Sequence, residues 1–366
     1  MNVKYFIFLL RQLQFNHPKH KISGFTLIEL LVSMVIATIV VSGLMSFVVQ
    51  LLSTNQQEAG QTQTQNDMQL ALDYITTDLR EAVYVYPGEC LRATGEGSKT
   101  ATTISPDYCP GVVNHIKTPP ANSMPILAFW KLDILPEVLI TSCGTATPPA
   151  GVPCTSGRTY TLVVYFLRKN LPSETIWPGK ARLLRYELPN YNSTTNTAIA
   201  NYVSPEQSGV GFRKWPWQFK SGAVTNLQTA IPGTGNNNAL PLTDFVDDTS
   251  RTGDNPVSPQ PPLCPINDEN PATQEDNGIY YRITPVVTAT PFAANMRSFY
   301  ACVKVDKTVE NATDVYDGGA VNQDILVFLR GNSEGRVQPS NNNKLPTLNA
   351  QVLRRSIVNK DPKAIQ

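Results

Sequence analysis

Histidine is scarce in this sequence, and neither sign of charge is in excess. Of three histidines in 366 residues, only His115 lies beyond residue 24, and no two cysteines have the Cys-x-x-Cys spacing. These absences disfavour a zinc site and a hydrolase with a histidine base. The formal net charge is +1 and no basic stripe stands out, so we expect no nucleic-acid partner.

Charge is absent altogether from Leu30 to Val49, a run of twenty residues. At ~1.5 Å per helical residue this run spans ~30 Å, the thickness of a bilayer's hydrocarbon core. Glu29 lies at its start, and a lone carboxylate inside a membrane segment costs on the order of 3 kcal/mol. An acid in this position predicts a partner and a role.

The flanks of the apolar run differ in charge. Residues 1–24 contain four basic side chains and no acid, namely Lys4, Arg11, Lys19 and Lys21. The first charges after the run are acidic, beginning with Glu58. Basic flanks stay cytoplasmic, so we expect a single-pass inner-membrane protein oriented N-in and C-out. A secretory signal would place small residues after its apolar region, and this sequence does not follow that pattern.

The segment Gly24-Phe-Thr-Leu-Ile-Glu-Leu-Leu-Val32 resembles the type IV prepilin cleavage and methylation motif of pilins and pseudopilins. The resemblance implies that residues 1–24 are a leader, which a prepilin peptidase removes after Gly24. It further implies that Phe25 becomes the N-methylated N-terminus and that Glu29 pairs with the terminal amine of a neighbouring subunit. An uncleaved single-pass anchor is the alternative.

After the anchor, residues 25–52, the helix is predicted to continue through residues 53–86. Apolar residues recur there in steps of four and three, which places them on one helical face: Met68, Leu72, Ile75, Leu79 and Ala82. The acids of this segment fall off or beside that stripe. Pro87-Gly88 is expected to end the helix.

Residues 87–366 are predicted to form a β-rich extracytoplasmic head. Short runs of β-branched and aromatic residues predict strands: 126–132, 160–167, 181–188, 279–287, 298–305, 324–329 and 352–359. Residues 231–277, rich in proline, Asn and Asp, predict a long loop. The fold class is α+β, with one long helix packed on an antiparallel sheet head that carries long loop insertions.

Six cysteines follow the leader, an even number that is compatible with disulfides outside the cytoplasm. Fifteen pairings are possible. Proximity in sequence favours Cys90 with Cys109 and Cys143 with Cys154, which leaves Cys264 with Cys302.

Three patterns bear on possible chemistry. Gly331-Asn-Ser333-Glu-Gly335 matches G-x-S-x-G, but no histidine follows it, so a turn serine is favoured. A group of acids offers oxygen ligands for calcium, although its spacing favours a solvated loop: Asp244, Asp247, Asp248 and Asp254. Trp215 and Trp217 form either a contact patch for a partner subunit or polysaccharide, or packing for a loop.

The strand pattern Tyr160–Arg168 with Arg182–Tyr186 also resembles the PilW-like, J-type minor pseudopilins, and the length and insertions resemble those of hormogonium polysaccharide secretion. This resemblance implies a structural subunit, without catalysis or cofactor, in a type II secretion-like assembly. Its partners would be other pilins and an inner-membrane platform, with the head in the periplasm or the filament. Two alternatives stay open: an adhesive minor pilin for motility or DNA uptake, and a membrane-anchored enzyme.

Overall fold

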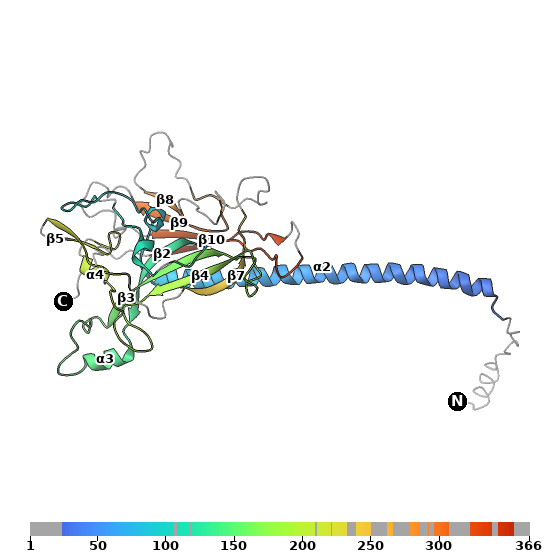
Figure 1. Cartoon of the computed structure of the whole chain (residues 1–366), viewed down its shortest axis with the longest axis horizontal. Helices are drawn as coiled ribbons and strands as arrows, with labels where there is room; N and C mark the ends of the chain where they lie inside the picture. Colours follow the sequence, from blue (N-terminus) through green and yellow to red (C-terminus); the bar gives the residue numbers. More distant parts are fainter. Residues whose placement is uncertain are drawn as a thin grey trace, which may run out of the picture. The chain divides into compact units, whose positions relative to one another are not determined.

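The computed structural model describes residues 24–105, 108–117, 119–208, 211–220, 222–232, 239–249, 262–265, 279–285, 292, 296–306, 323–338 and 343–354. The chain divides into two units, Met1–Gln56 and Gln57–Gln366. The predicted leader lies outside the described residues except for Gly24. The second unit, which we call the head, contains the end of the long helix and every strand (Figure 1).

Helix α2 covers Leu27–Glu81 without a break. Thr26 precedes it and caps its first turn, because its Oγ1 accepts the backbone N–H of Glu29 at 3.4 Å. The helix ends five residues earlier than the predicted end at residue 86. Ala82–Val85 instead forms strand β1, which pairs antiparallel with β2 at Phe129–Lys131. The prediction was wrong here because pairing with β2 outweighs the local helical pattern.

The described strands of the head form three antiparallel sheets. The main sheet has the order β1-β2-β3-β4-β7, with β2 at Ser123–Ile134, β3 at Arg158–Lys169, β4 at Ala181–Leu188 and β7 at Leu240–Val246. A second sheet has the order β11-β10-β9-β8, formed by Leu348–Arg354, Gln323–Leu329, Phe299–Asp306 and Ile279–Thr284. The small sheet pairs β5, Trp217–Lys220, with β6, Ala223–Asn226. Short helices connect these strands: η1 (Gly88–Leu91), η2 (Val112–His115), α3 (Glu137–Cys143) and α4 (Pro205–Ser208).

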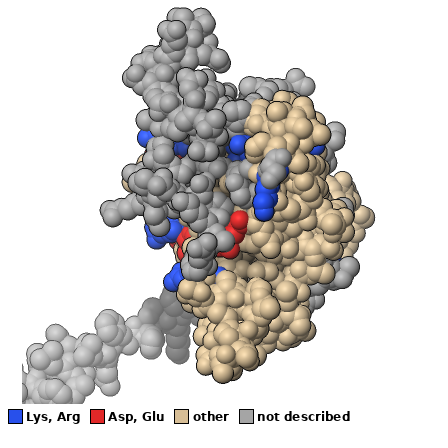
Figure 2. Space-filling view, turned by 90° about the vertical axis from the view of Figure 1, so that its left-hand side faces the viewer, with Lys and Arg blue, Asp and Glu red and all other residues tan. Residues whose placement is uncertain are grey.

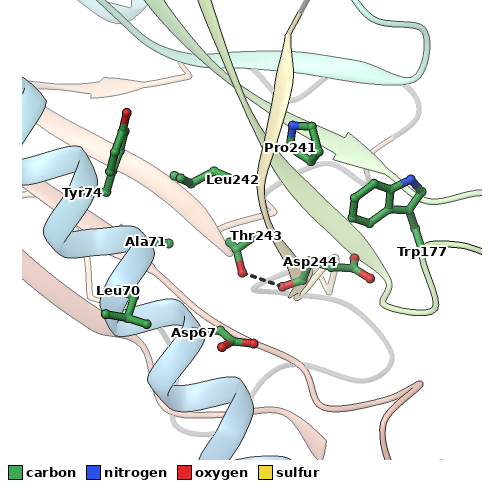
Figure 3. A pocket seen from close by; sticks show the side chains of 9 residues that line it. All are labelled: Asp67, Leu70, Ala71, Tyr74, Trp177, Pro241, Leu242, Thr243 and Asp244. Carbon is green, nitrogen blue, oxygen red and sulfur yellow. Dashed lines mark hydrogen bonds between the residues drawn. The ribbon is translucent and has the colours of Figure 1, made fainter.

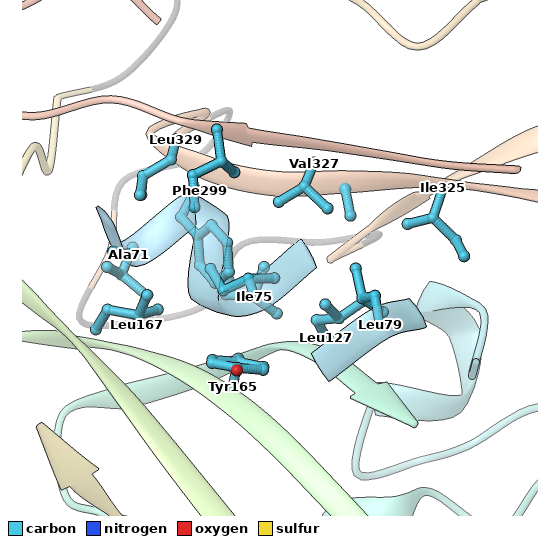
Figure 4. Close-up of a cluster of buried hydrophobic side chains, with 14 of the residues drawn as sticks. Ala71, Ile75, Leu79, Leu127, Tyr165, Leu167, Phe299, Ile325, Val327 and Leu329 are labelled. Carbon is cyan, nitrogen blue, oxygen red and sulfur yellow. The ribbon is translucent and has the colours of Figure 1, made fainter. Parts of the chain in front are cut away.

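The core of the head lies on both sides of α2. Figure 4 shows the helix between the main sheet and the second sheet, with Ile75 and Leu79 packed toward strands of both. All five residues of the predicted stripe are buried, and Ile75 and Leu79 are 0% exposed. Full burial of an aliphatic side chain contributes about 1.5–3 kcal/mol, so the stripe holds the helix in the head.

A second apolar cluster covers the opposite face of the main sheet. It joins Trp130, Val164, Phe166 and Tyr186 of the sheet to Trp215 and other residues of the connecting segments. Strand β3 is therefore buried on both faces, which explains its unbroken apolar run, Leu162–Leu167.

The predicted loop 231–277 contains strand β7. Leu240–Val246 pairs with β4 and forms one edge of the main sheet, so the loop prediction was wrong for this segment. Pro241 lies within the strand, and proline is tolerated in a sheet at such an edge. The prolines that suggested a loop therefore also fit an edge strand.

The connection between β2 and β3 projects from the sheet with no buried residue in α3. Between Pro136 and Gly157 its only charged residue is Glu137, and a disulfide joins Cys143 to Cys154. Figure 2 views the side of the head on which α3 lies, where uncharged residues cover a broad area. A covalent link thus supports a segment that has no core of its own.

Candidate functional site

The N-terminal motif lies at the start of α2. Gly24, Phe25 and Thr26 precede the helix, and Glu29 lies in its first turn. Phe25 is 74% exposed, and no atom lies within 4 Å of a Cβ built on Gly24. A peptidase that cuts between these two residues would meet an accessible segment. Glu29 lies near the positive end of the helix dipole, which favours a carboxylate.

Residues 24–56 are exposed almost throughout, although most of them are apolar. Within the described part of the chain, α2 is the single helix long and apolar enough to cross a membrane, and the apolar window is 0% buried. An uninterrupted exposed apolar surface needs a lipid or protein environment. This part of α2 therefore fits a membrane anchor, and it fits a bundle of like helices equally well.

Residues 19–45 match the family model for the prokaryotic N-terminal methylation motif. No curated protein and no solved structure matches the chain. The matched segment includes Gly24, Phe25 and Glu29. The motif supports a type IV pilin-family protein with a single-pass N-terminal anchor, a class of structural subunits rather than of enzymes.

Three disulfides join the cysteines in the pairs that sequence proximity favours. Their Cα–Cα distances are 5.4 Å for Cys90–Cys109, 5.3 Å for Cys143–Cys154 and 5.6 Å for Cys264–Cys302. All lie within the range for unstrained bridges. Cys90 and Cys109 lie in the apolar cluster on the far face of the main sheet, and Cys302 lies in a small separate cluster with Tyr300 and Phe328.

Trp215 and Trp217 do not form one surface. Trp215 is fully buried, donates its indole N–H to the Val203 carbonyl at 2.7 Å and packs edge-on against Trp130. A contact patch that includes Trp215 is therefore excluded, and the packing interpretation holds for it. Trp217 on β5 is half-buried, with the Lys99 ammonium 3.9 Å from its ring centroid.

In the described part of the predicted acidic loop, each acid is paired with other residues of the head. Asp247 is fully buried and pairs with Arg330 at 2.6 Å. Asp244 accepts hydrogen bonds from Asn170 and the Gly179 N–H, and Asp248 pairs with Lys169 at 3.1 Å. Among the described residues no group of acids, histidines and cysteines could hold a metal ion. Asp254 lies outside the described residues.

Ser333 is buried, and its hydroxyl donates to the Asn343 carbonyl at 3.3 Å rather than to a side-chain base. This agrees with the turn serine favoured by the sequence. The following turn instead reaches α2, because Arg336 bonds Asp67 and, at 3.1 Å, the Thr64 hydroxyl.

A buried charge network lies at the end of α2, and no sequence pattern predicted it. Asp78 accepts the Tyr165 hydroxyl at 2.6 Å and the Arg185 guanidinium at 2.7 Å. Burial lowers the pKa of Lys131, but the nearby carboxylates of Asp133, Asp78 and Glu187 outweigh it and raise the pKa overall. Burial, followed by the charge of Asp78, raises the pKa of Tyr165. The sequence held one signal, a basic residue within each of two largely apolar strand runs, Lys131 in β2 and Arg185 in β4.

Proposed function

We propose that this chain is a minor pseudopilin, a structural subunit of a type IV pilus-like or type II secretion-like assembly. The observation that carries the proposal is the methylation motif at residues 19–45, followed by an exposed apolar helix. In this proposal a prepilin peptidase cuts after Gly24, and the new N-terminus at Phe25 is methylated. An inner-membrane platform then moves the helix from the bilayer into a filament.

Glu29 gives the assembly its register. A charged carboxylate among apolar helices is strongly disfavoured without a counter-ion, and so is an isolated ammonium. The amine that cleavage exposes on Phe25 of a neighbouring subunit pairs with the Glu29 carboxylate, so that each charge gains a counter-ion. Only one axial offset between two helices brings these groups together, so pairing selects that offset.

The head supports a minor rather than a major subunit. It contains three sheets and a projecting disulfide-closed segment. Such an irregular body is poorly suited to close repetition along a filament, whereas a subunit present in few copies tolerates it. The resemblance to the hormogonium group leads us to assign the assembly to polysaccharide secretion, with the head in the periplasm or the filament.

The deciding experiment replaces Glu29 by Gln in the native cell. We expect normal cleavage and membrane insertion but loss from the sheared filament fraction, measured by immunoblot with mass spectrometry of the N-terminus. Glu58→Gln is the matched control, an exposed acid further along the same helix, and it should enter filaments normally. Normal incorporation of the Glu29 variant would overturn the pairing.

The cleavage step has its own test. Gly24→Leu should leave a protein heavier by the 24-residue leader. A mature form that still appears would place the cut elsewhere. The same variant cells distinguish the two assemblies. Loss of exported polysaccharide with intact pilus motility would support the secretion assignment. Loss of pilus motility with intact polysaccharide export would support the adhesive minor pilin.

A further inference from the structure

A groove opens on the head between α2 and the edge strand β7. It has a volume of about 640 Å³ and is lined by nine residues: Asp67, Leu70, Ala71, Tyr74, Trp177, Pro241, Leu242, Thr243 and Asp244. Figure 3 shows Tyr74 on the helix at one side and Trp177, from the β3–β4 connection, at the other, with Pro241 and Leu242 between them. None of the sequence patterns predicted this groove.

An arginine side chain contacts each of the two aromatic rings. The Arg182 guanidinium carbon lies 4.9 Å from the Trp177 ring centroid, and that of Arg185 lies 5.4 Å from the Tyr74 centroid. Neither arginine is among the residues that line the groove. Cation–π contact fixes the rings while Tyr74 stays 46% exposed, which leaves aromatic surface available to a ligand.

Two carboxylates at the groove are also held in place. Arg336 donates to Asp67, while Asn170 and the Gly179 N–H donate to the two oxygens of Asp244. A carboxylate has about four acceptor positions, so both acids keep capacity for further donors. The Thr243 hydroxyl, which donates to the Asp244 carbonyl, adds another acceptor.

Three kinds of ligand fit this groove poorly. Strand addition at β7 is disfavoured by Pro241, since proline at an edge obstructs pairing. An anion finds no lysine or arginine among the described lining residues, and it meets two acids. An aromatic cage for an organic cation would need rings that converge on one point, whereas Tyr74 and Trp177 lie on opposite sides of the groove. The charge of Asp67 is also already balanced by Arg336.

A chain of neutral sugar rings fits the groove better than these three kinds of ligand. The apolar face of a pyranose packs on an aromatic ring, as other apolar groups do, and its hydroxyls donate to carboxylates. Two separated rings suit two sugar units of one chain. We propose that the groove between α2 and β7 binds a neutral polysaccharide chain, with Tyr74 and Trp177 as stacking platforms and Asp67 and Asp244 as hydroxyl acceptors. This inference depends on the head alone and not on assembly into a filament.

The test is isothermal titration calorimetry of the full chain with three neutral hexasaccharides, the hexamers of β-1,4-glucan, α-1,4-glucan and β-1,4-mannan. The protein is kept in a detergent without a sugar headgroup, because such headgroups would compete for the groove. We expect saturable binding of at least one neutral hexamer and none of hexagalacturonate. Trp177→Ala and Tyr74→Ala should each weaken binding roughly fivefold to tenfold.

Matched control variants test whether binding occurs in the groove and independently of assembly. Trp217→Ala removes a half-buried aromatic ring elsewhere on the head and should bind like the unaltered chain. Glu29→Gln should also bind normally, so a failure of assembly would not affect the result. Near-ultraviolet circular dichroism establishes that each variant is folded. Absence of binding by every neutral hexamer, preference for hexagalacturonate, or undiminished binding by both groove variants would overturn the proposal.

Discussion

The two parts of α2 belong to one continuous helix yet differ in their surroundings. From Leu27 to Gln56 the side chains are apolar or uncharged except for Glu29, and they are exposed. From Gly60 to Leu79 nine residues are buried in the head, among them the acid Asp78. The difference teaches that apolar content alone does not decide what a helix packs against. The first part is uniformly apolar and suits lipid or like helices, whereas the second is a stripe that matches two sheets.

Two of the acids of the helix, Glu29 and Asp78, sharpen this contrast. Glu29 lies in the exposed first turn, and we propose that its partner is the terminal amine of another subunit. Asp78 receives its donors from Tyr165 and Arg185 of the same head. One helix therefore carries an acid for assembly and an acid for folding, and substitutions in the two parts should differ in their effects.

Truncation of an apolar side chain should matter only in the packed part. Ile75→Ala removes a side chain that is 0% exposed between two sheets, so we expect a loss of about 2–5 kcal/mol in the free energy of unfolding of the head. Ile39→Ala, at a residue 67% exposed, should change it by less than about 0.5 kcal/mol. Urea unfolding of the full chain in detergent, followed by near-ultraviolet circular dichroism, measures both. Equal losses of unfolding free energy in the two variants would contradict the difference between the two parts of the helix.

Neutralisation of Asp78 should lower the stability of the head, whereas neutralisation of Glu29 should prevent filament entry. Asp78→Asn leaves the partly buried Arg185 with only Glu187, and we expect about 2–3 kcal/mol lower stability, below the full cost of breaking a buried pair. Glu29→Gln should leave the stability of the head unchanged while filament entry is lost. The same unfolding assay, combined with filament fractionation, separates them. A stable Asp78→Asn head would show that the network is dispensable.

The two glycines of the helix should respond differently to alanine. At Gly60 a Cβ would lie 2.4 Å from Val337 Cγ1, a contact that real side chains do not make. Gly60→Ala should therefore destabilise the head by about 1–2 kcal/mol despite its better helix propensity. At Gly43 nothing lies within 4 Å of such a Cβ, so Gly43→Ala should not destabilise the head. Adding Val337→Ala should restore the Gly60 variant, and failure of this rescue would assign its defect to another cause.

The stability of the head should depend on pH through His115, the sole histidine after residue 24. Burial lowers the pKa of His115, and a smaller opposing effect comes from its hydrogen bond with Gln228. The unfolded chain then binds this proton more readily than the folded one. The contribution of His115 is present above pH ~6.5 and is lost as the pH falls below it.

The measurement is the midpoint of thermal unfolding between pH 7.5 and 5.0. The unaltered chain should lose stability over this range by an amount that His115→Gln reduces. An identical pH profile for the two proteins would mean that His115 does not titrate with folding.

Much of the fold followed from residue patterns. Four- and three-residue steps placed Met68, Leu72, Ile75 and Leu79 on one buried face, and strand β4 was predicted with its observed bounds, Ala181–Leu188. The patterns were wrong for residues 82–85 and for β7, because both strands owe their conformation to partners far away in sequence, β2 and β4. Local propensity cannot report such pairing.

The sequence by itself determined the anchor and the methylation motif. These are properties of consecutive residues: a glycine, an acid and an uncharged run whose length matches a bilayer. The tertiary structure alone decided that Asp78 is buried, that Asp247 pairs with Arg330, and that Tyr74 and Trp177 line one groove. Those arrangements join residues from distant elements, and their energies depend on burial and geometry that exist only once the sheets have closed around the helix.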